Sequence, residues 1–199
     1  MTAPGLPVVA IGSSADGIHA LRALVRGLGA TLPAAVVIVQ HRTATQPSML
    51  AVLLTRATPL RVKDLAHGET LEAGTIYIAP PGVHVVVADG AFRLDPGERV
   101  AHSRPSIDVL FHSVARACAA VAVGVLLGGA GRDGAEGLAA MRKAGGHTLV
   151  QDPADAKYRW MPEAALSLDG HVVLPLAEIG PEITRLATAL AGRSAAQRR

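Results

Sequence analysis

Runs of apolar, largely β-branched residues constrain the fold of this chain more than any other feature. They cover residues 7–12, 35–40, 121–127 and 148–151. Both faces of these runs are apolar, which is typical of strands in a parallel sheet covered by helices on both sides. Helical patterns lie between them at residues 17–27, 46–56, 106–119 and 134–144, and a closing one lies at 181–190. We expect an α/β fold with one doubly wound, mostly parallel sheet.

The middle of the chain has a different pattern. Short strand-like runs at 75–79, 84–88 and 91–94 are separated by Pro80-Pro81-Gly82 and by Asp89-Gly90, and the second of these is a strong hairpin signal. We interpret this region as a β-hairpin insertion. The whole chain, 1–199, is then one domain, with a core at 7–190 and a flexible tail at 191–199.

Composition narrows the classes of partner and compartment. The net charge is +3, but the basic residues are spread thinly, and only 3% of residues are aromatic, so no nucleic-acid partner is expected. Cys118 is the single cysteine, which excludes an internal disulfide and suits the reducing cytoplasm. The sequence shows neither a signal peptide nor an apolar run long enough to span a membrane, so we expect no membrane insertion.

Polar residues follow two of the expected strands at the point where each ends. Ser13 and Ser14 stand where a strand turns into a helix, and the free N–H groups of that helix could stabilise an oxyanion. The same serines could simply cap the helix. His41 follows the second strand and could act as a general base, although a histidine at a strand end is often structural.

A glycine-rich turn after the third buried run has two interpretations. Gly129, Gly131 and Gly134 match the dinucleotide-binding fingerprint, and Asp152 follows at about the expected distance. Alternatively, Asp133 in this turn orients a catalytic histidine, and the glycines bring the backbone close to the reacting carbonyl. Motifs for a P-loop, a Gly-x-Ser-x-Gly turn and a His-Glu-x-x-His metal site do not occur.

Several segments, in order along the chain, resemble the catalytic domain of the chemotaxis protein-glutamate methylesterases, the CheB family. The resemblance extends from Val8 to about Leu190. Its segments are Ile11-Gly12-Ser13-Ser14, Val39-Gln40-His41, Tyr77-Ile78-Ala79-Pro80, residues 104–115, Gly131-Arg132-Asp133-Gly134 and Met161-Pro162. The family usually carries an N-terminal receiver domain, whereas this chain begins almost at the catalytic strand. We expect a stand-alone catalytic domain, the alternative being that a receiver domain has been removed from it.

The resemblance implies a function and a set of site residues. It implies hydrolysis of γ-glutamyl methyl esters, and deamidation of glutamines, on the cytoplasmic helices of methyl-accepting chemoreceptors. By position, Ser14 is the nucleophile, His41 the general base and Asp133 its partner. Neither a cofactor nor a metal is needed. Residues expected to line the cleft or the oxyanion site are Ala15, Gly17, Arg104, Gly129, Ala130 and Gly131.

Some residues depart from the family pattern. Ala15 and Asp16 replace Thr and Gly after the serine, Ala130 replaces a methionine, and Arg132 replaces an asparagine. We expect Asp16 to face solvent at the helix N-terminus, where its charge is favourable. These departures leave open a catalytically weakened member that acts as a binding or regulatory module. Ser106 could cap a helix or line the cleft.

Overall fold

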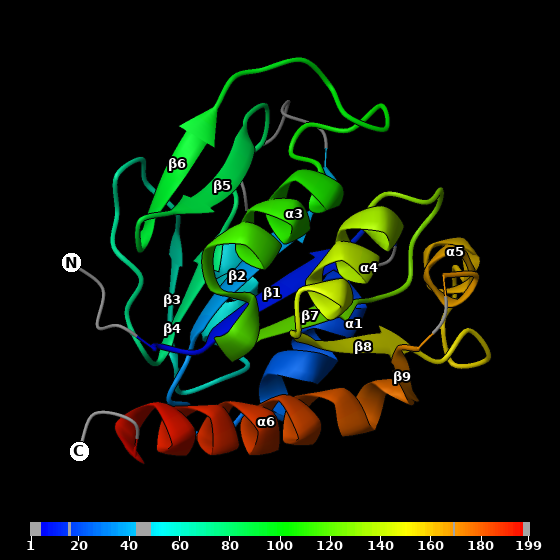
Figure 1. Ribbon diagram of the computed structural model, residues 1–199. Coiled ribbons are helices and arrows are strands. Elements are labelled where there is room, and N and C mark those ends of the chain that lie inside the picture. The colour runs from blue at the N-terminus through cyan, green and yellow to red at the C-terminus, as the bar shows by residue number, and fades with distance from the viewer. Residues whose placement is uncertain (1–4, 16, 43–48, 169, 197–199) are drawn as a thin grey trace.

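A seven-stranded parallel sheet forms the centre of the computed structural model (Figure 1), which describes residues 5–15, 17–42, 49–168 and 170–196. The strand order is β3-β4-β2-β1-β7-β8-β9, and every neighbouring pair is parallel. The strands are β1 (Val8–Ser13), β2 (Ala35–Gln40), β3 (Arg61–Asp64), β4 (Thr75–Ile78), β7 (Ala122–Leu126), β8 (His147–Gln151) and β9 (Val172–Leu174).

Helices cover both faces of this sheet, as Figure 1 shows with α6 and α1 on one side and α3 and α4 on the other. The first layer contains α1 (Gly17–Arg26), α2 (Leu50–Thr55) and α6 (Leu176–Ala196). The second contains α3 (Ile107–Cys118), α4 (Ala135–Lys143) and α5 (Trp160–Leu166). A short 3-10 turn, Ala119–Val121, leads from α3 into β7.

Alternation along the strands divides the core into two apolar layers. Val9 and Ile11 of β1 pack with the α1, α2 and α6 layer, whereas Val8 and Ala10 pack with the α3, α4 and α5 layer. Successive side chains of a strand point to opposite faces, so a strand buried on both faces must be apolar throughout. This explains why the apolar runs are continuous.

The hairpin insertion consists of β5 (His84–Ala88) and β6 (Ala91–Asp95), paired in antiparallel fashion. It packs beside α3, and the ring of Phe92 lies 4.8 Å from the ring of Tyr77 in β4. The expected doubly wound parallel fold with a β-hairpin is confirmed. Residues 75–78, however, belong to the central sheet as β4 and not to the hairpin region.

Sequence patterns missed three elements and misplaced the ends of a fourth. β3 has polar, partly exposed residues at the edge of the sheet, β9 is a short and largely exposed edge strand, and α5 has only two turns. The sequence pattern predicts a closing helix at residues 181–190. In the structure this helix, α6, begins at Leu176, and its Gly180 lies against Gly27, the residue after α1. α6 continues through Ala196, so residues 191–196, which the sequence pattern assigns to a flexible tail, are helical, and residues 197–199 lie outside the described part of the chain.

The order of the strands determines where polar side chains gather. β1 lies in the middle, between β2 and β7, with Ser13 beside Gln40 and Gly12 beside Leu126. The chain leaves β1 towards β2 on one side and later returns to β7 on the other, so this is the point where the strand order reverses. Ligands bind at such a reversal in doubly wound sheets. The segments after β1, β2 and β7 therefore meet at one edge.

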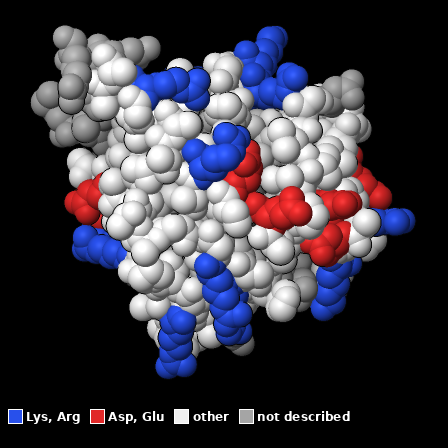
Figure 2. All heavy atoms as spheres, turned by 90° about the horizontal axis from the view of Figure 1, so that it is seen from below, with Lys and Arg blue, Asp and Glu red and all other residues white. Residues whose placement is uncertain are grey.

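Two surface properties accompany this fold. On the face where α6 lies, cationic and acidic side chains are interspersed (Figure 2), and Arg185 pairs with Glu182 at 2.7 Å. None of the helices among the described residues has the length and apolar character that crossing a membrane requires.

We predict that Gly12→Ala destabilises the protein. A Cβ at this position would overlap the side chain of Ile107, and overpacking of a core typically costs about 1–3 kcal/mol. The matched control is Gly192→Ala on α6, where a Cβ meets nothing within 4 Å and alanine improves helix propensity by about 1 kcal/mol. Denaturant unfolding should show opposite shifts for the two variants. Equal effects would contradict the predicted contact between β1 and α3.

Candidate active site

Ser14 occupies the turn between β1 and α1. Its N–H donates to the carbonyl of Gly128 at 3.3 Å, and its own carbonyl accepts from Gly17 at 2.9 Å. Gly17 has no room for a side chain, since a Cβ there would overlap the amide of Gln40. The two serines differ: the hydroxyl of Ser13 is buried and donates to Gln40, whereas that of Ser14 faces His41.

Gln40 joins the serine turn to the histidine loop. Its side-chain amino group donates to the carbonyl of Ser14 at 2.7 Å and to that of His41 at 3.0 Å, while its Oε1 accepts from Ser13. One nearly buried amide therefore fixes the main chain on both sides of the site. No role for Gln40 is predicted from the sequence, although a polar residue at the end of an apolar strand is a signal for one.

His41 bridges Ser14 and Asp133. Its Nδ1 lies 3.2 Å from the Ser14 hydroxyl oxygen, and its Nε2 lies 2.7 Å from Asp133 Oδ2. Because an ionised carboxylate only accepts hydrogen bonds, Nε2 carries the proton, and Nδ1 is left as an acceptor for the serine hydroxyl. The structure thus brings together the three residues that the sequence analysis singled out.

Asp133 is a buried carboxylate that accepts four hydrogen bonds. Besides His41, the donors are the hydroxyl of Ser106 at 2.8 Å, the N–H of Ile107 at 2.8 Å and the N–H of Asp108 at 3.0 Å. Burial opposes ionisation, but the hydrogen bonds outweigh it and lower the pKa of Asp133. The positive end of α3 also faces this carboxylate. Asp133 is therefore held in its charged form.

Ser106 both caps α3 and supports the site. Its hydroxyl accepts from the N–H of Val109 at 3.4 Å while donating to Asp133. Its N–H donates to Nδ1 of the buried His84, whose Nε2 donates to the carbonyl of Glu98 at 2.8 Å. This connects the hairpin to the site. Sequence reasoning missed His84, because nothing in a hairpin strand indicates which distant helix it will support.

The glycine-rich turn after β7 comes very close to the serine turn. A Cβ on Gly129 would lie only 2.6 Å from that of Ser14, so this position requires glycine. Gly131 and Gly134 have φ values of 88° and 98°, which glycine adopts without strain. Ala130 and Gly131 are exposed, whereas Asp133 is directed inward.

The same turn does not offer a free phosphate site. A dinucleotide would need the N–H groups in the first turn of α4. The N–H of Gly137 there already donates to the Asp108 carboxylate at 2.7 Å. Burial raises the pKa of Asp108, the nearby Asp133 charge acts in the same direction, and the bond from Gly137 opposes them. If a dinucleotide bound here, its phosphate would lie against the anionic side chain of Asp108, which disfavours the dinucleotide interpretation.

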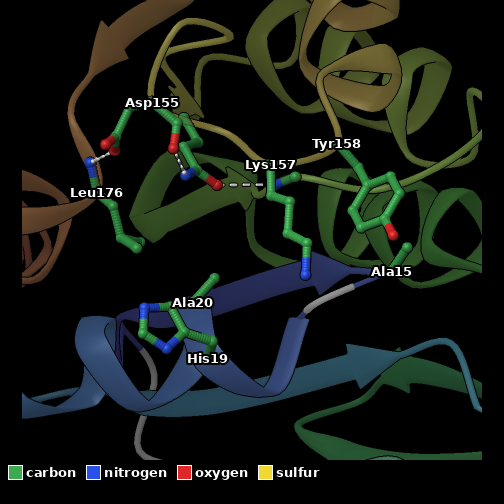
Figure 3. Close-up of a pocket in the computed structure, with 9 residues that line it drawn as sticks. Ala15, His19, Ala20, Asp155, Lys157, Tyr158 and Leu176 are labelled. Carbon is green, nitrogen blue, oxygen red and sulfur yellow. Dashed lines mark hydrogen bonds between the residues drawn. The ribbon is translucent and has the colours of Figure 1, made fainter.

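A pocket of about 290 Å³ opens beside the serine turn (Figure 3). It is lined by Ala15, His19, Ala20, Gly128, Gln151, Asp155, Lys157, Tyr158 and Leu176. The Asp155 carboxylate accepts from the N–H of Leu176 at 2.6 Å, and Gln151 Oε1 accepts from Gly128 at 2.9 Å. The pocket therefore separates α1 from the loop that follows β8.

The side chain of Arg104 contacts the loop after β6. Its guanidinium donates to the carbonyls of Pro96 at 3.0 Å and Gly97 at 2.8 Å. Asp16 lies outside the described residues, so its expected orientation stays a prediction. In the described part of the chain, no group of three or more His, Cys, Asp or Glu side chains is placed to hold a metal.

Comparison with known proteins identifies the family. The family model for the CheB methylesterase matches residues 9–183. The chain belongs to the CheB methylesterase family. The crystal structure of the CheB methylesterase catalytic domain from Thermotoga maritima superposes with a TM-score of 0.84 at 28% identity, covering 90% of this chain and 98% of that one.

Curated CheB relatives are more similar in sequence. Protein-glutamate methylesterase/protein-glutamine glutaminase 1 of Caulobacter vibrioides is 42% identical over 94% of this chain and 55% of its own length. Protein-glutamate methylesterase FrzG of Myxococcus xanthus is 39% identical over 89% of this chain and 54% of its own length. The chain spans about half the length of these curated relatives.

We predict that Asp133→Asn lowers the free energy of unfolding by about 2–4 kcal/mol at neutral pH, because one amide cannot accept from four donors. Since the folded-state pKa of Asp133 is lowered, its charge stabilises the protein above the unfolded pKa near 3.8 and ceases to do so as the pH falls through the folded value. The difference in the free energy of unfolding between wild type and variant should therefore become smaller at acidic pH.

The control for this prediction is Asp89→Asn. The Asp89 side chain is 84% exposed and pairs with Arg93 on the surface, so its loss should change stability by less than about 1 kcal/mol at any pH. Unfolding in denaturant at several pH values between 7 and 3 measures both variants. If the difference in the free energy of unfolding between wild type and Asp133→Asn stays the same at every pH, the charge of Asp133 does not stabilise the protein as predicted.

Proposed function

We propose that this protein hydrolyses γ-glutamyl methyl esters on the cytoplasmic helices of methyl-accepting chemoreceptors, with Ser14 as nucleophile, His41 as general base and Asp133 as its partner. The observation that carries the proposal is the continuous hydrogen-bond chain from the Ser14 hydroxyl through His41 to Asp133, at 3.2 Å and 2.7 Å. The names of the relatives support the same activity. Acting on these helices places the enzyme in the cytoplasm.

The geometry fits the two half-reactions of a serine hydrolase. Ser14 Oγ attacks the ester carbon, and its proton moves to Nδ1 of His41. The imidazolium that forms is stabilised by the ionised Asp133 at Nε2. Nδ1 then returns the proton to the leaving methoxide, and methanol departs. Water attacks the acyl-enzyme with His41 again as base, which releases the glutamate and restores Ser14.

Two main-chain donors are available for the oxyanion. The N–H groups of Ser14, Gly128 and Gly129 are occupied by protein partners. Within the described residues, the N–H groups of Ala15 and Ala130 have no such partner and flank the Ser14 turn. We assign them to the oxyanion of the tetrahedral intermediate. Because these donors belong to the backbone, the alanines at both positions can supply them.

Deamidation of glutamine uses the same relay. An amide leaves as ammonia only after its nitrogen is protonated, and Nδ1 of the imidazolium is placed to deliver that proton. The alternative of a weakened member that only binds partners rested on Ala15, Asp16 and Ala130. The hydrogen-bond relay runs through none of these side chains, so it favours an enzyme over a binding module.

We predict that Ser14→Ala abolishes methanol release from methylated receptor membranes, whereas Ser13→Ala keeps most of the activity. The Ser13 hydroxyl is buried against Gln40, so its loss should affect stability more than rate. Covalent labelling with a fluorophosphonate should follow the same ranking. The reverse ranking of the two variants would overturn the assignment of the nucleophile.

We also predict that Asp133→Asn lowers kcat by about 10³–10⁴-fold. The Asn amino group would face Nε2 and force the ring proton onto Nδ1, which then cannot accept the Ser14 proton. The folded fraction of the variant, measured by circular dichroism, corrects the rate for any loss of stability. A variant with near wild-type kcat would show that Asp133 does not set the tautomer of His41.

A further inference from the structure

The few aromatic residues of this chain are distributed unevenly between core and surface. The sequence contains one Trp, two Tyr and two Phe. Tyr77, Phe92 and Phe111 are fully buried, but Trp160 is 54% exposed and Tyr158 is half-buried beside it. The two rings are 5.9 Å apart with an interplanar angle of 36°. A paired, exposed tryptophan and tyrosine is the composition that binding surfaces favour.

This aromatic pair is held rigidly at the rim of the active site. The carbonyl of Tyr158 accepts from the N–H of Gly129 at 2.8 Å, and the N–H of Met161 donates to the carbonyl of Gly129 at 3.1 Å. Gly129 in turn packs against Ser14. Met161 is fully buried and anchors the start of α5, while Tyr158 forms a wall of the pocket beside Ala15 (Figure 3).

The size of the reacting group determines what must touch this rim. A glutamyl side chain extends only about 4 Å from its Cα to the ester carbon. When that carbon reaches Ser14, the main chain of the substrate is pressed against the surface around the site. Residues on either side of the reacting glutamate then contact the rim, where Tyr158 and Trp160 lie.

We propose that Tyr158 and Trp160 dock the substrate polypeptide next to the reacting residue, by packing against apolar side chains of an acidic, helical segment. This rests on the proposed function. The charges nearby fit such a segment, because Lys157 and Arg159 alternate with the two rings along residues 157–160, where the loop enters α5. Lys157 Nζ lies 5.7 Å from the Tyr158 ring centroid, and Arg159 pairs with Glu163 at 3.2 Å. The reacting methyl ester itself is uncharged, but glutamates that stand unesterified in the same segment complement these cations.

The test compares a protein substrate with a small one. For Trp160→Ala, kcat/KM should fall at least about tenfold for methanol release from methylated receptor membranes, mostly through KM. Hydrolysis of p-nitrophenyl acetate, which has no polypeptide to dock, should change by less than about twofold. Trp160→Phe should recover much of the loss. The control is Val172→Ala on β9, a side chain with similar exposure (51%), and it should alter neither rate.

Each other outcome has a defined meaning. An equal loss on both substrates would show that Trp160 acts through Met161 and Gly129 on the catalytic residues, which overturns the docking role. Unchanged rates on both substrates would overturn it as well. If the wild type hydrolyses p-nitrophenyl acetate but releases no methanol from receptors, the proposed function itself is wrong. The docking role of Tyr158 and Trp160 is then overturned as well, before any variant is compared.

Discussion

The buried charge of Asp133 is the interaction on which the rest of the site depends. A carboxylate removed from water is strongly unfavourable unless donors surround it. Here the donors come from the start of α3 and from His41, which are far from Asp133 in sequence. Satisfying this one charge therefore fixes α3, the glycine-rich turn and the histidine loop relative to each other. The hairpin joins the same network through His84 and Ser106.

The site also requires the backbone turns around Ser14 to approach one another closely, and small residues allow this. Gly17 leaves space for the Gln40 amide, and Gly129 allows the turn after β7 to touch Ser14. A side chain at either position would separate the nucleophile from its surroundings. The proposed oxyanion donors are main-chain N–H groups for the same reason, since they lie where turns come together and require no particular side chain. This is consistent with alanine at positions 15 and 130.

The core and the rim of the site have different physical tasks. Continuous apolar strands give a rigid sheet whose ends hold Ser14, His41 and Asp133 in place, and rigid placement is what acyl transfer requires. The loop after β8 and the start of α5 are attached to this frame through Gly129, and they leave Trp160 exposed and Tyr158 half-buried. In our proposal, the residues at the ends of the sheet carry out the chemistry, and Tyr158 and Trp160 recognise the polypeptide.

The sequence by itself determined the fold class and the location of the polar residues. Short β-branched apolar runs such as 35–40 are typical of strands covered on both faces. Ser14 and His41 follow such runs directly, and Asp133 lies a few residues beyond another. It could not reveal β3 or β9, because edge strands are partly exposed and lack the continuous apolar pattern. The roles of Gln40, His84 and Ser106, and the contacts of Arg104 with the loop after β6, depend on which distant groups face them. Only the packing of α3 and the hairpin against the sheet decided those partners, since a hydrogen bond between residues far apart in the chain leaves no local pattern in either segment.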